Sequence, residues 1–249
     1  MSGNLERCSS VNCIFQGRSV APPGRGIGRA IAEVLHGEGC KVALNGRTAE
    51  DLAAAAADLP GAVAVAGDVT RPDDAQRIVA AGVEALGSLD ILVCNVGGGH
   101  SVPPGDETYD EWQRVFALNL WSTTNTIEAA WDALAPRGVI ICVSSICGLE
   151  VVPGAPVTYS AAKAALHAYV RGIARPLGQR GIRIHAVAPG NILFDDSTWS
   201  RKLAEDAGLV EAMLQRDVAE RLLAAPGSIN PVLGFAAILS IALAAGGAA

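Results

Sequence analysis

Tyr159 and Lys163 lie four residues apart in an alanine-rich segment that the sequence predicts to be helical. This spacing places the Tyr159 phenol and the Lys163 ammonium group on one face of the helix. The pKa of a free phenol is roughly 10, and a cation held within reach can lower it by about 1 to 3 pH units. The pair therefore predicts a general acid or base that works near neutral pH.

Two serines, Ser144 and Ser145, follow the apolar run from Val139 to Val143, which predicts a buried strand. A serine hydroxyl at the end of this strand can hold a carbonyl oxygen beside the Tyr159 phenol. By position alone, either serine can take this role. A Tyr-x-x-x-Lys spacing arises by chance in many helices, so the neighbouring serines make the combination much more specific.

Three glycines, Gly24, Gly26 and Gly28, open a segment whose apolar residues recur at helical spacing up to Gly37. Glycines before a helix leave backbone N–H groups open to an anion, and the helix dipole favours a phosphate at that end. The cluster therefore indicates a phosphate-binding loop, and the strand that follows it makes this interpretation stronger.

The residues after the next predicted strand bear on the choice of cofactor. In the dinucleotide-binding folds that this glycine loop, helix and strand resemble, members that prefer NAD carry an acidic residue at the end of the second strand, where it holds the ribose hydroxyls. Here Asn45 stands at that place, Arg47 follows it, and Arg25 lies inside the glycine cluster. Two guanidinium groups and no carboxylate suit a 2′-phosphate, which arginine can bind through two parallel hydrogen bonds. The pattern favours NADP(H) over NAD(H). The alternative is that both arginines are solvated surface side chains.

Strands and helices are predicted to alternate along the chain. The predicted strands cover residues 41–44, 62–66, 89–94, 139–143 and 182–188, and further helices cover 49–59, 73–86, 107–134 and 159–177. This alternation predicts an α/β fold, a doubly wound parallel sheet of the Rossmann type with helices on both faces, as one domain over residues 1–249. Ligands bind beyond the carboxyl ends of such strands, where the sequence places Asn45, Asp68, Asn95, Ser145 and Gly190.

Composition excludes several classes of function. The net charge is −6 and the pI is near 5.2, without basic runs, so we expect no nucleic-acid partner.

Six cysteines form no CxxC pair, and we expect reduced thiols, as in a cytoplasmic protein. His36, His167 and His185 have no metal-ligand spacing and are interpreted as structural. The N-terminus has no signal-peptide pattern.

These motifs resemble those of the short-chain dehydrogenase/reductase family, in family order, from about Gly24 to Ile192. The resemblance assigns a catalytic set of Asn119, Ser145, Tyr159 and Lys163, and Ser145 is preferred over Ser144 because Gly148 completes a family Ser-x-x-Gly pattern. It implies that Tyr159 exchanges a proton with the substrate oxygen, Lys163 lowers its pKa and binds the nicotinamide ribose, Ser145 orients the substrate, and Asn119 supports a proton-relay water. The expected cofactor contacts are Gly24, Arg25, Gly26, Ile27, Gly28, Asn45, Arg47, Asp68, Val69, Asn95, Gly97, Tyr159, Lys163, Pro189, Gly190 and Ile192.

Both ends of the chain, residues 1–20 and 219–249, differ from the family pattern. Pro22 stands where the family has the first glycine of its loop, and proline offers no N–H and fixes φ. The family's final strand is not recognisable after about Val218. The apolar segment from Val232 to Ala249 reaches the lower range for a membrane span. We interpret it as a buried helix or a surface covered in an oligomer, with a tail anchor as the second interpretation.

The sequence thus predicts an NADP(H)-dependent oxidoreductase that interconverts a small carbonyl compound and an alcohol, similar to 3-oxoacyl reductases and carbonyl reductases. The resemblance implies a homodimer or homotetramer. The alternative, favoured by Pro22 and the altered C-terminus, is a non-catalytic or cofactor-weakened relative that serves as a binding or oligomerisation protein.

Overall fold

The computed structural model describes residues 12–16, 26–152, 154–190, 204, 205 and 208 of the 249-residue chain. The predictions that concern Pro22, Gly24, Arg25, Ile192 and the apolar C-terminal segment lie outside these residues. Within the described part, no helix has the length and apolar character needed to cross a membrane.

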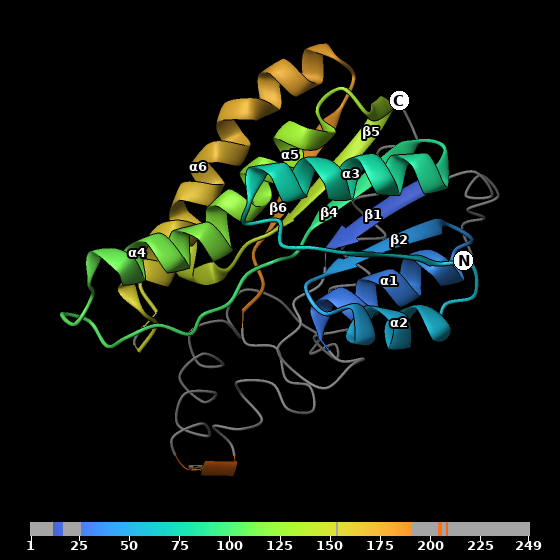
Figure 1. Ribbon diagram of the computed structural model, residues 1–249. Coiled ribbons are helices and arrows are strands. Elements are labelled where there is room, and N and C mark those ends of the chain that lie inside the picture. The colour runs from blue at the N-terminus through green and yellow to red at the C-terminus, as the bar shows by residue number, and fades with distance from the viewer. Residues whose placement is uncertain (1–11, 17–25, 153, 191–203, 206–207, 209–249) are drawn as a thin grey trace.

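The described residues form one sheet of six parallel strands in the order β3-β2-β1-β4-β5-β6 (Figure 1). The strands are β1 Asn12–Gln16, β2 Lys41–Gly46, β3 Val63–Ala66, β4 Leu89–Cys94, β5 Leu134–Val143 and β6 Arg183–Val187. The chain builds outward from β1 to β3, returns to the other side of β1, and continues outward from β4 to β6. This is the predicted doubly wound topology, and its switch point lies between β1 and β4.

Helices cover both faces of the sheet (Figure 1). They are α1 Ile27–Gly37, α2 Ala49–Ala57, α3 Pro72–Leu86, α4 Tyr109–Phe116, α5 Ser122–Ala130 and α6 Val157–Gln179, with a short π-helix η2 Ala117–Trp121 and a 3₁₀-helix η3 Ile146–Gly148. Each βα connection brings the carboxyl end of a strand to the same edge of the sheet, which gathers the predicted site residues there.

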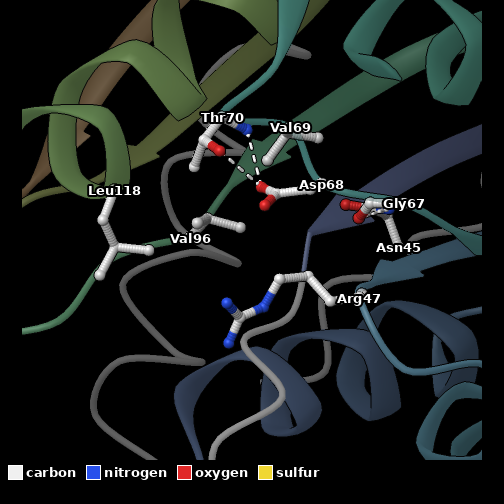
Figure 2. Close-up of a pocket in the computed structure, with 9 residues that line it drawn as sticks. Asn45, Arg47, Gly67, Asp68, Val69, Thr70, Val96 and Leu118 are labelled. Atoms are coloured by element: carbon white, nitrogen blue, oxygen red, sulfur yellow. Dashed lines mark hydrogen bonds between the residues drawn. The ribbon is translucent and has the colours of Figure 1, made fainter. Parts of the chain in front are cut away.

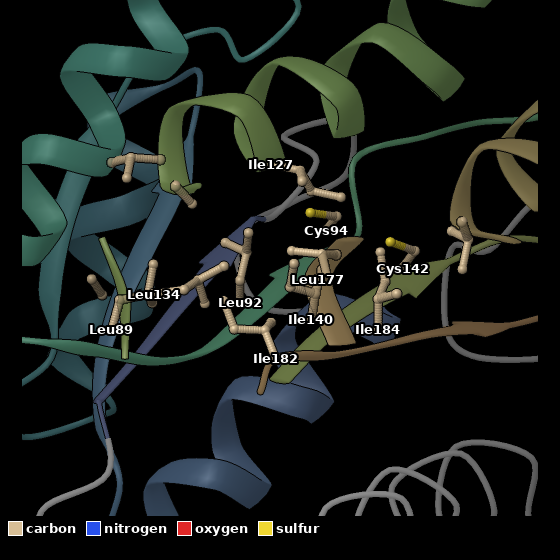
Figure 3. Packing of buried hydrophobic residues seen from close by; sticks show 14 of the residues in the cluster. Leu89, Leu92, Cys94, Ile127, Leu134, Ile140, Cys142, Leu177, Ile182 and Ile184 are labelled. Atoms are coloured by element: carbon tan, nitrogen blue, oxygen red, sulfur yellow. The ribbon is translucent and has the colours of Figure 1, made fainter. Parts of the chain in front are cut away.

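The side chains of strand β4 pack into the hydrophobic core on both faces of the sheet. Ile91 and Val93 pack with residues of α1 and α2, whereas Leu92 and Cys94 pack with residues of α3, α5 and α6 (Figure 3). Side chains of a strand point to alternate faces, and a strand buried on both faces reads as a continuous apolar run. The apolar runs of the sequence are therefore explained by a sheet that is covered on both sides.

The predicted thiols are buried in this core. Cys40, Cys94 and Cys142 are buried, and Cys94 lies beside Cys142 on the neighbouring strand (Figure 3). A hydrogen bond with the Cys142 thiol, together with burial, raises the pKa of Cys94 well above its usual value. Cys94 therefore stays protonated, and it acts as a small apolar residue.

One sequence prediction is corrected by the structure, and one strand that the sequence left unassigned is located by it. The single helix predicted over residues 107–134 is divided into α4, η2 and α5 and ends at Ala130, and β5 begins at Leu134, which pairs with Leu89. A π-helical turn holds only one extra residue, so it changes the apolar spacing too little to be visible in the sequence. The first strand, which has little period in the sequence, lies at Asn12–Gln16 and pairs with both β2 and β4.

Candidate active site

The carboxyl end of β5 presents two buried serines in different surroundings. Ser144 is 5% exposed, and its Oγ lies 3.0 Å from Nε2 of His167 on α6. Ser145 is 7% exposed and caps η3, where its Oγ accepts a hydrogen bond of 3.2 Å from the Cys147 N–H. Since that bond uses only a lone pair of Ser145, its hydroxyl proton remains able to bind a carbonyl oxygen.

Lys163 is almost fully enclosed, with 3% of its surface exposed. Its Nζ donates a hydrogen bond of 2.9 Å to the Val143 carbonyl and lies 5.9 Å from the centroid of the Tyr159 ring. Burial lowers the pKa of Lys163 to about 8. At neutral pH most of the population is still protonated, so a positive charge lies beside the Tyr159 phenol, as the four-residue spacing predicts.

Asn119 lies in η2 and is fully buried. Its Oδ1 accepts a hydrogen bond from the Gly98 N–H (2.9 Å), and its Nδ2 donates to the carbonyls of Gly98 (3.1 Å) and Val115 (3.0 Å). The amide therefore fixes the loop that follows β4 to the π-helical turn. Single π-turns inside helices are found frequently at functional sites.

Gly97 and Gly99 bring this loop against the other candidate residues. A Cβ on Gly97 would lie 2.9 Å from Asn119 Oδ1 and 3.0 Å from Lys163 Nζ, and a Cβ on Gly99 would lie 3.7 Å from the Tyr159 ring. A side chain at position 97 would have to displace one of these polar groups. The loop thus gathers Asn119, Tyr159 and Lys163 at the switch point of the sheet.

A small hydrogen-bond network holds the next part of the loop to α4 and α6. Ser101 Oγ donates to Glu111 (2.7 Å) and lies 2.7 Å from the hydroxyl of Thr158, which is fully buried next to Tyr159. Hydrogen bonds from Arg114 and Ser101 lower the pKa of Glu111 to about 2. The carboxylate stays ionised at all physiological pH values and anchors the residue that precedes Tyr159.

A pocket opens beside the ends of β2 and β3 (Figure 2). Its lining consists of Asn45, Gly46, Arg47, Gly67, Asp68, Val69, Thr70, Val96 and Leu118. Asp68 Oδ1 accepts hydrogen bonds from the Thr70 N–H (3.0 Å) and Oγ1 (2.8 Å), and the exposed Arg47 side chain extends toward the space below Asp68 in Figure 2. The predicted residues Arg47, Asp68 and Val69 thus share one pocket.

Asn45 also lines this pocket, but its amide group serves the sheet. It is 2% exposed, and its Nδ2 donates to the carbonyls of Val65 (2.9 Å) and Gly67 (3.2 Å) at the end of β3. These bonds hold the β3 loop in place and use both N–H groups of Asn45. Its contribution to ligand binding is therefore limited to its oxygen and backbone.

Gly26 and Pro189 are placed beside the same edge. Gly26 precedes α1 with φ of 116°, a conformation that favours glycine, and α1 begins at Ile27 with Gly28 buried behind it. The Pro189 carbonyl accepts a hydrogen bond of 3.1 Å from the Ile146 N–H, which ties the turn after β6 to the serine loop. The predicted nicotinamide turn and the predicted catalytic loop are therefore neighbours.

Sequence reasoning missed the contact between Ser144 and His167. His167 is 8% exposed and lies one helical turn after Lys163, so both side chains extend from one face of α6 toward the end of β5. The four-residue spacing from Lys163 was the available signal. Within the described residues, no group of His, Cys, Asp or Glu has the arrangement of a metal site.

Comparisons with known proteins show which families and structures this chain is similar to. The model of a family described as enoyl-(acyl carrier protein) reductase matches residues 22–240. Glucose 1-dehydrogenase of Gluconobacter oxydans is 36% identical over 190 residues, which cover 72% of this chain and 71% of that protein. A short-chain dehydrogenase/reductase structure from Burkholderia xenovorans has a TM-score of 0.80 at 25% identity, covering 94% of this chain and 90% of that one. A short-chain dehydrogenase from Burkholderia cenocepacia J2315, solved in complex with NADP, has a TM-score of 0.74 at 27% identity, covering 94% and 91%.

Proposed function

The chain belongs to the short-chain dehydrogenase/reductase family of oxidoreductases, and we propose that it interconverts a ketone or aldehyde and an alcohol with NADP(H). The observation that carries this proposal is the buried Lys163 ammonium group beside the Tyr159 ring at the switch point of the sheet. A bound nicotinamide cofactor supplies or accepts the hydride, and the protein supplies position and electrostatics.

The residues present fit a dinucleotide. The N–H groups at the start of α1 follow Gly26 and suit a pyrophosphate, and the pocket beside Arg47 and Asp68 suits the adenosine half. Gly97 keeps the backbone after β4 close to Lys163, whose ammonium group donates one hydrogen bond to the Val143 carbonyl and has further N–H groups that suit a ribose hydroxyl. Along the sheet, the pocket at β2 and β3 comes first, the start of α1 after β1 second, and Lys163 beside β5 third. A dinucleotide bound across this edge would place its adenosine, pyrophosphate and nicotinamide in the same order.

Each catalytic side chain has one role in the reduction of a carbonyl. The Ser145 hydroxyl donates a hydrogen bond to the substrate oxygen and orients it. The Tyr159 phenol donates its proton to that oxygen as the carbon receives the hydride, and Lys163 stabilises the phenolate that remains. Asn119 holds the loop of Gly97 to Gly99 against this pair. In alcohol oxidation the same groups act in reverse.

Arg47 is the described residue that we expect to bind a 2′-phosphate. Arg47→Ala should raise the Kd for NADPH by about 10- to 100-fold, since a hydrogen bond to a charged group contributes about 1.5–3 kcal/mol. The Kd for NADH should stay within about twofold. Lys41→Ala is the control, because Lys41 is an exposed cation at the opposite end of β2, the strand that Arg47 follows. Equal losses for both nucleotides, measured by fluorescence titration, would contradict a role in 2′-phosphate binding.

Lys163→Met should reveal the cost of burying the ammonium group. Burial lowers the pKa of Lys163 from 10.5 to about 8, so between these values the unfolded chain binds more protons than the folded one. The unfolding free energy of the wild type, minus that of the variant, should therefore rise with pH, by up to about 1.4 kcal/mol per pH unit. Urea unfolding at pH 8 and pH 10 measures this difference, with Lys41→Met as the control variant because Lys41 is exposed. A difference that stays flat or falls would refute the buried charge.

The relatives suggest two substrate classes, an acyl thioester and a sugar. The family model that matches this chain is described as enoyl-(acyl carrier protein) reductase. This description favours a second candidate reaction, the reduction of a carbon–carbon double bond in an enoyl thioester. A panel of a 3-oxoacyl thioester, a 2-enoyl thioester, simple ketones and glucose, followed through nicotinamide absorbance, tests the proposal. Turnover of a carbonyl or alcohol supports it, and turnover of the enoyl thioester alone replaces it with the second candidate. Cofactor binding without any turnover would favour the non-catalytic alternative.

A further inference from the structure

The contact between His167 and the serine loop has no part in the roles assigned above. Ser144 and His167 are both buried, with His167 Nε2 lying 3.0 Å from Ser144 Oγ and 3.4 Å from the Ser145 carbonyl oxygen. We propose that His167 and Ser144 form a positioning pair that holds the Ser145 hydroxyl in register with Tyr159 and Lys163. This inference rests on the proposed function, since it concerns the alignment of its catalytic serine.

Both contacts of Nε2 are favourable hydrogen bonds in one tautomer of His167. A carbonyl oxygen can only accept, so Nε2 must carry a proton for its contact with Ser145 to be favourable. The same N–H then lies between the Ser145 carbonyl and Ser144 Oγ, which accepts as well. This arrangement engages the Ser144 oxygen with α6 and leaves Ser145 as the serine directed to the substrate.

Two successive turns of helix α6 form hydrogen bonds with the end of β5 and the serines that follow it. Lys163 Nζ bonds the Val143 carbonyl, and His167, four residues later, bonds the next two residues. On the opposite side, the Ser144 N–H donates to the Val187 carbonyl of β6 (2.7 Å). The backbone of the serine loop is therefore held between α6 and β6, and both the proton donor and its charged partner lie on the helix that holds it.

Loss of His167 should release the Ser145 peptide without removing any group that touches the substrate. The Ser145 carbonyl also accepts from the Gly148 N–H (3.1 Å), so rotation of this peptide would disturb η3 and the Oγ that caps it. A misplacement of about 1 Å at a reacting group can cost up to roughly 100-fold in rate. We expect a smaller loss here, because the β6 bonds remain.

The test compares His167→Leu, His167→Gln, Ser144→Ala and the Ser144→Ala/His167→Leu double variant, assayed well below their unfolding temperatures. His167→Leu should lower kcat about tenfold with the KM for NADPH within twofold. Gln should restore most of the rate, because its amide nitrogen is the same number of bonds from Cβ as Nε2 and also donates. The kcat of the double variant should be at most twofold lower than that of His167→Leu, since the two residues act as one unit.

His36→Leu is the matched control, because His36 also contacts a carbonyl, that of Pro60 at 2.9 Å, but from the far end of α1. Its kcat should not change. In ¹⁵N spectra of the imidazole rings, Ser144→Ala should move the Nε2 signal of His167 and leave those of His36, His100 and His185 in place.

A kcat of His167→Leu within twofold of an active wild type would overturn this inference alone, as would a loss that Gln fails to restore or an unmoved Nε2 signal. If the wild type itself reduces or oxidises nothing in the substrate panel, the proposed function fails and this inference fails with it. The activity of the wild type therefore separates the two failures.

Discussion

Tyr159→Phe is expected to lower kcat by about 100- to 10,000-fold, the usual contribution of a positioned general acid or base. The change removes only the hydroxyl and keeps the ring, which lies in van der Waals distance of the Gly99 position. Lys163 and its bond to Val143 are untouched, so the Kd for NADPH should stay within about twofold. Steady-state kinetics on the best substrate and a fluorescence titration measure the two quantities.

Tyr169→Phe serves as the control for this experiment. Tyr169 lies on the same helix, and burial raises the pKa of its phenol, so it cannot exchange a proton near neutral pH. Its removal should leave kcat within twofold. Unchanged turnover in Tyr159→Phe would remove Tyr159 from the mechanism, and a parallel loss of cofactor affinity would make it a binding residue instead.

Gly148→Ala is expected to damage both the fold and the rate. A Cβ at this position would lie 2.6 Å from the carbonyl carbon of Lys163 and 2.8 Å from both its oxygen and the Ala164 nitrogen. These are backbone atoms of α6 and cannot rotate away, so the helix and η3 must separate. Overpacking of this kind costs about 1–3 kcal/mol of unfolding free energy, and kcat should fall with it because Ser145 moves relative to Lys163.

Gly178→Ala provides the comparison for Gly148→Ala. Gly178 lies near the end of α6 with no atom within 4 Å of an added Cβ. Alanine there should be neutral or stabilise the helix by up to about 1 kcal/mol, with kcat unchanged. Urea unfolding and kcat of both variants check the pair of predictions. Equal stability of the two variants would mean that η3 and α6 are not packed as closely as described.

The centre of the sheet could be predicted from the sequence because β2, β4 and the last part of β5 are buried on both faces. The runs around Leu92 and Ile140 stay apolar along their length, and helices of regular period separate them. The catalytic spacing was also readable, since a helix places residues four apart on one face whatever surrounds it. Tyr159 and Lys163 therefore lie as expected.

The remaining features depend on contacts between distant parts of the chain. The amide of Asn45 bonds carbonyls of Val65 and Gly67, some twenty residues away, and no local pattern indicates that partner. The same holds for His167, whose partners Ser144 and Ser145 lie on another element. The position of β1 is set by pairing with β2 and β4 rather than by its own period.

A titration of the purified chain with NADPH and, separately, with NADH tests whether this protein is a nicotinamide-dependent oxidoreductase that prefers NADP(H). Binding can be followed by the fluorescence of its four tryptophans and by thermal unfolding. A ligand at 100 times its Kd stabilises the folded state by about 2.7 kcal/mol, which gives a clear rise in Tm. We predict saturable binding of NADPH with a lower Kd than that of NADH. The absence of a response to either nucleotide would contradict it, and the chain would then be a member of the family without its oxidoreductase activity.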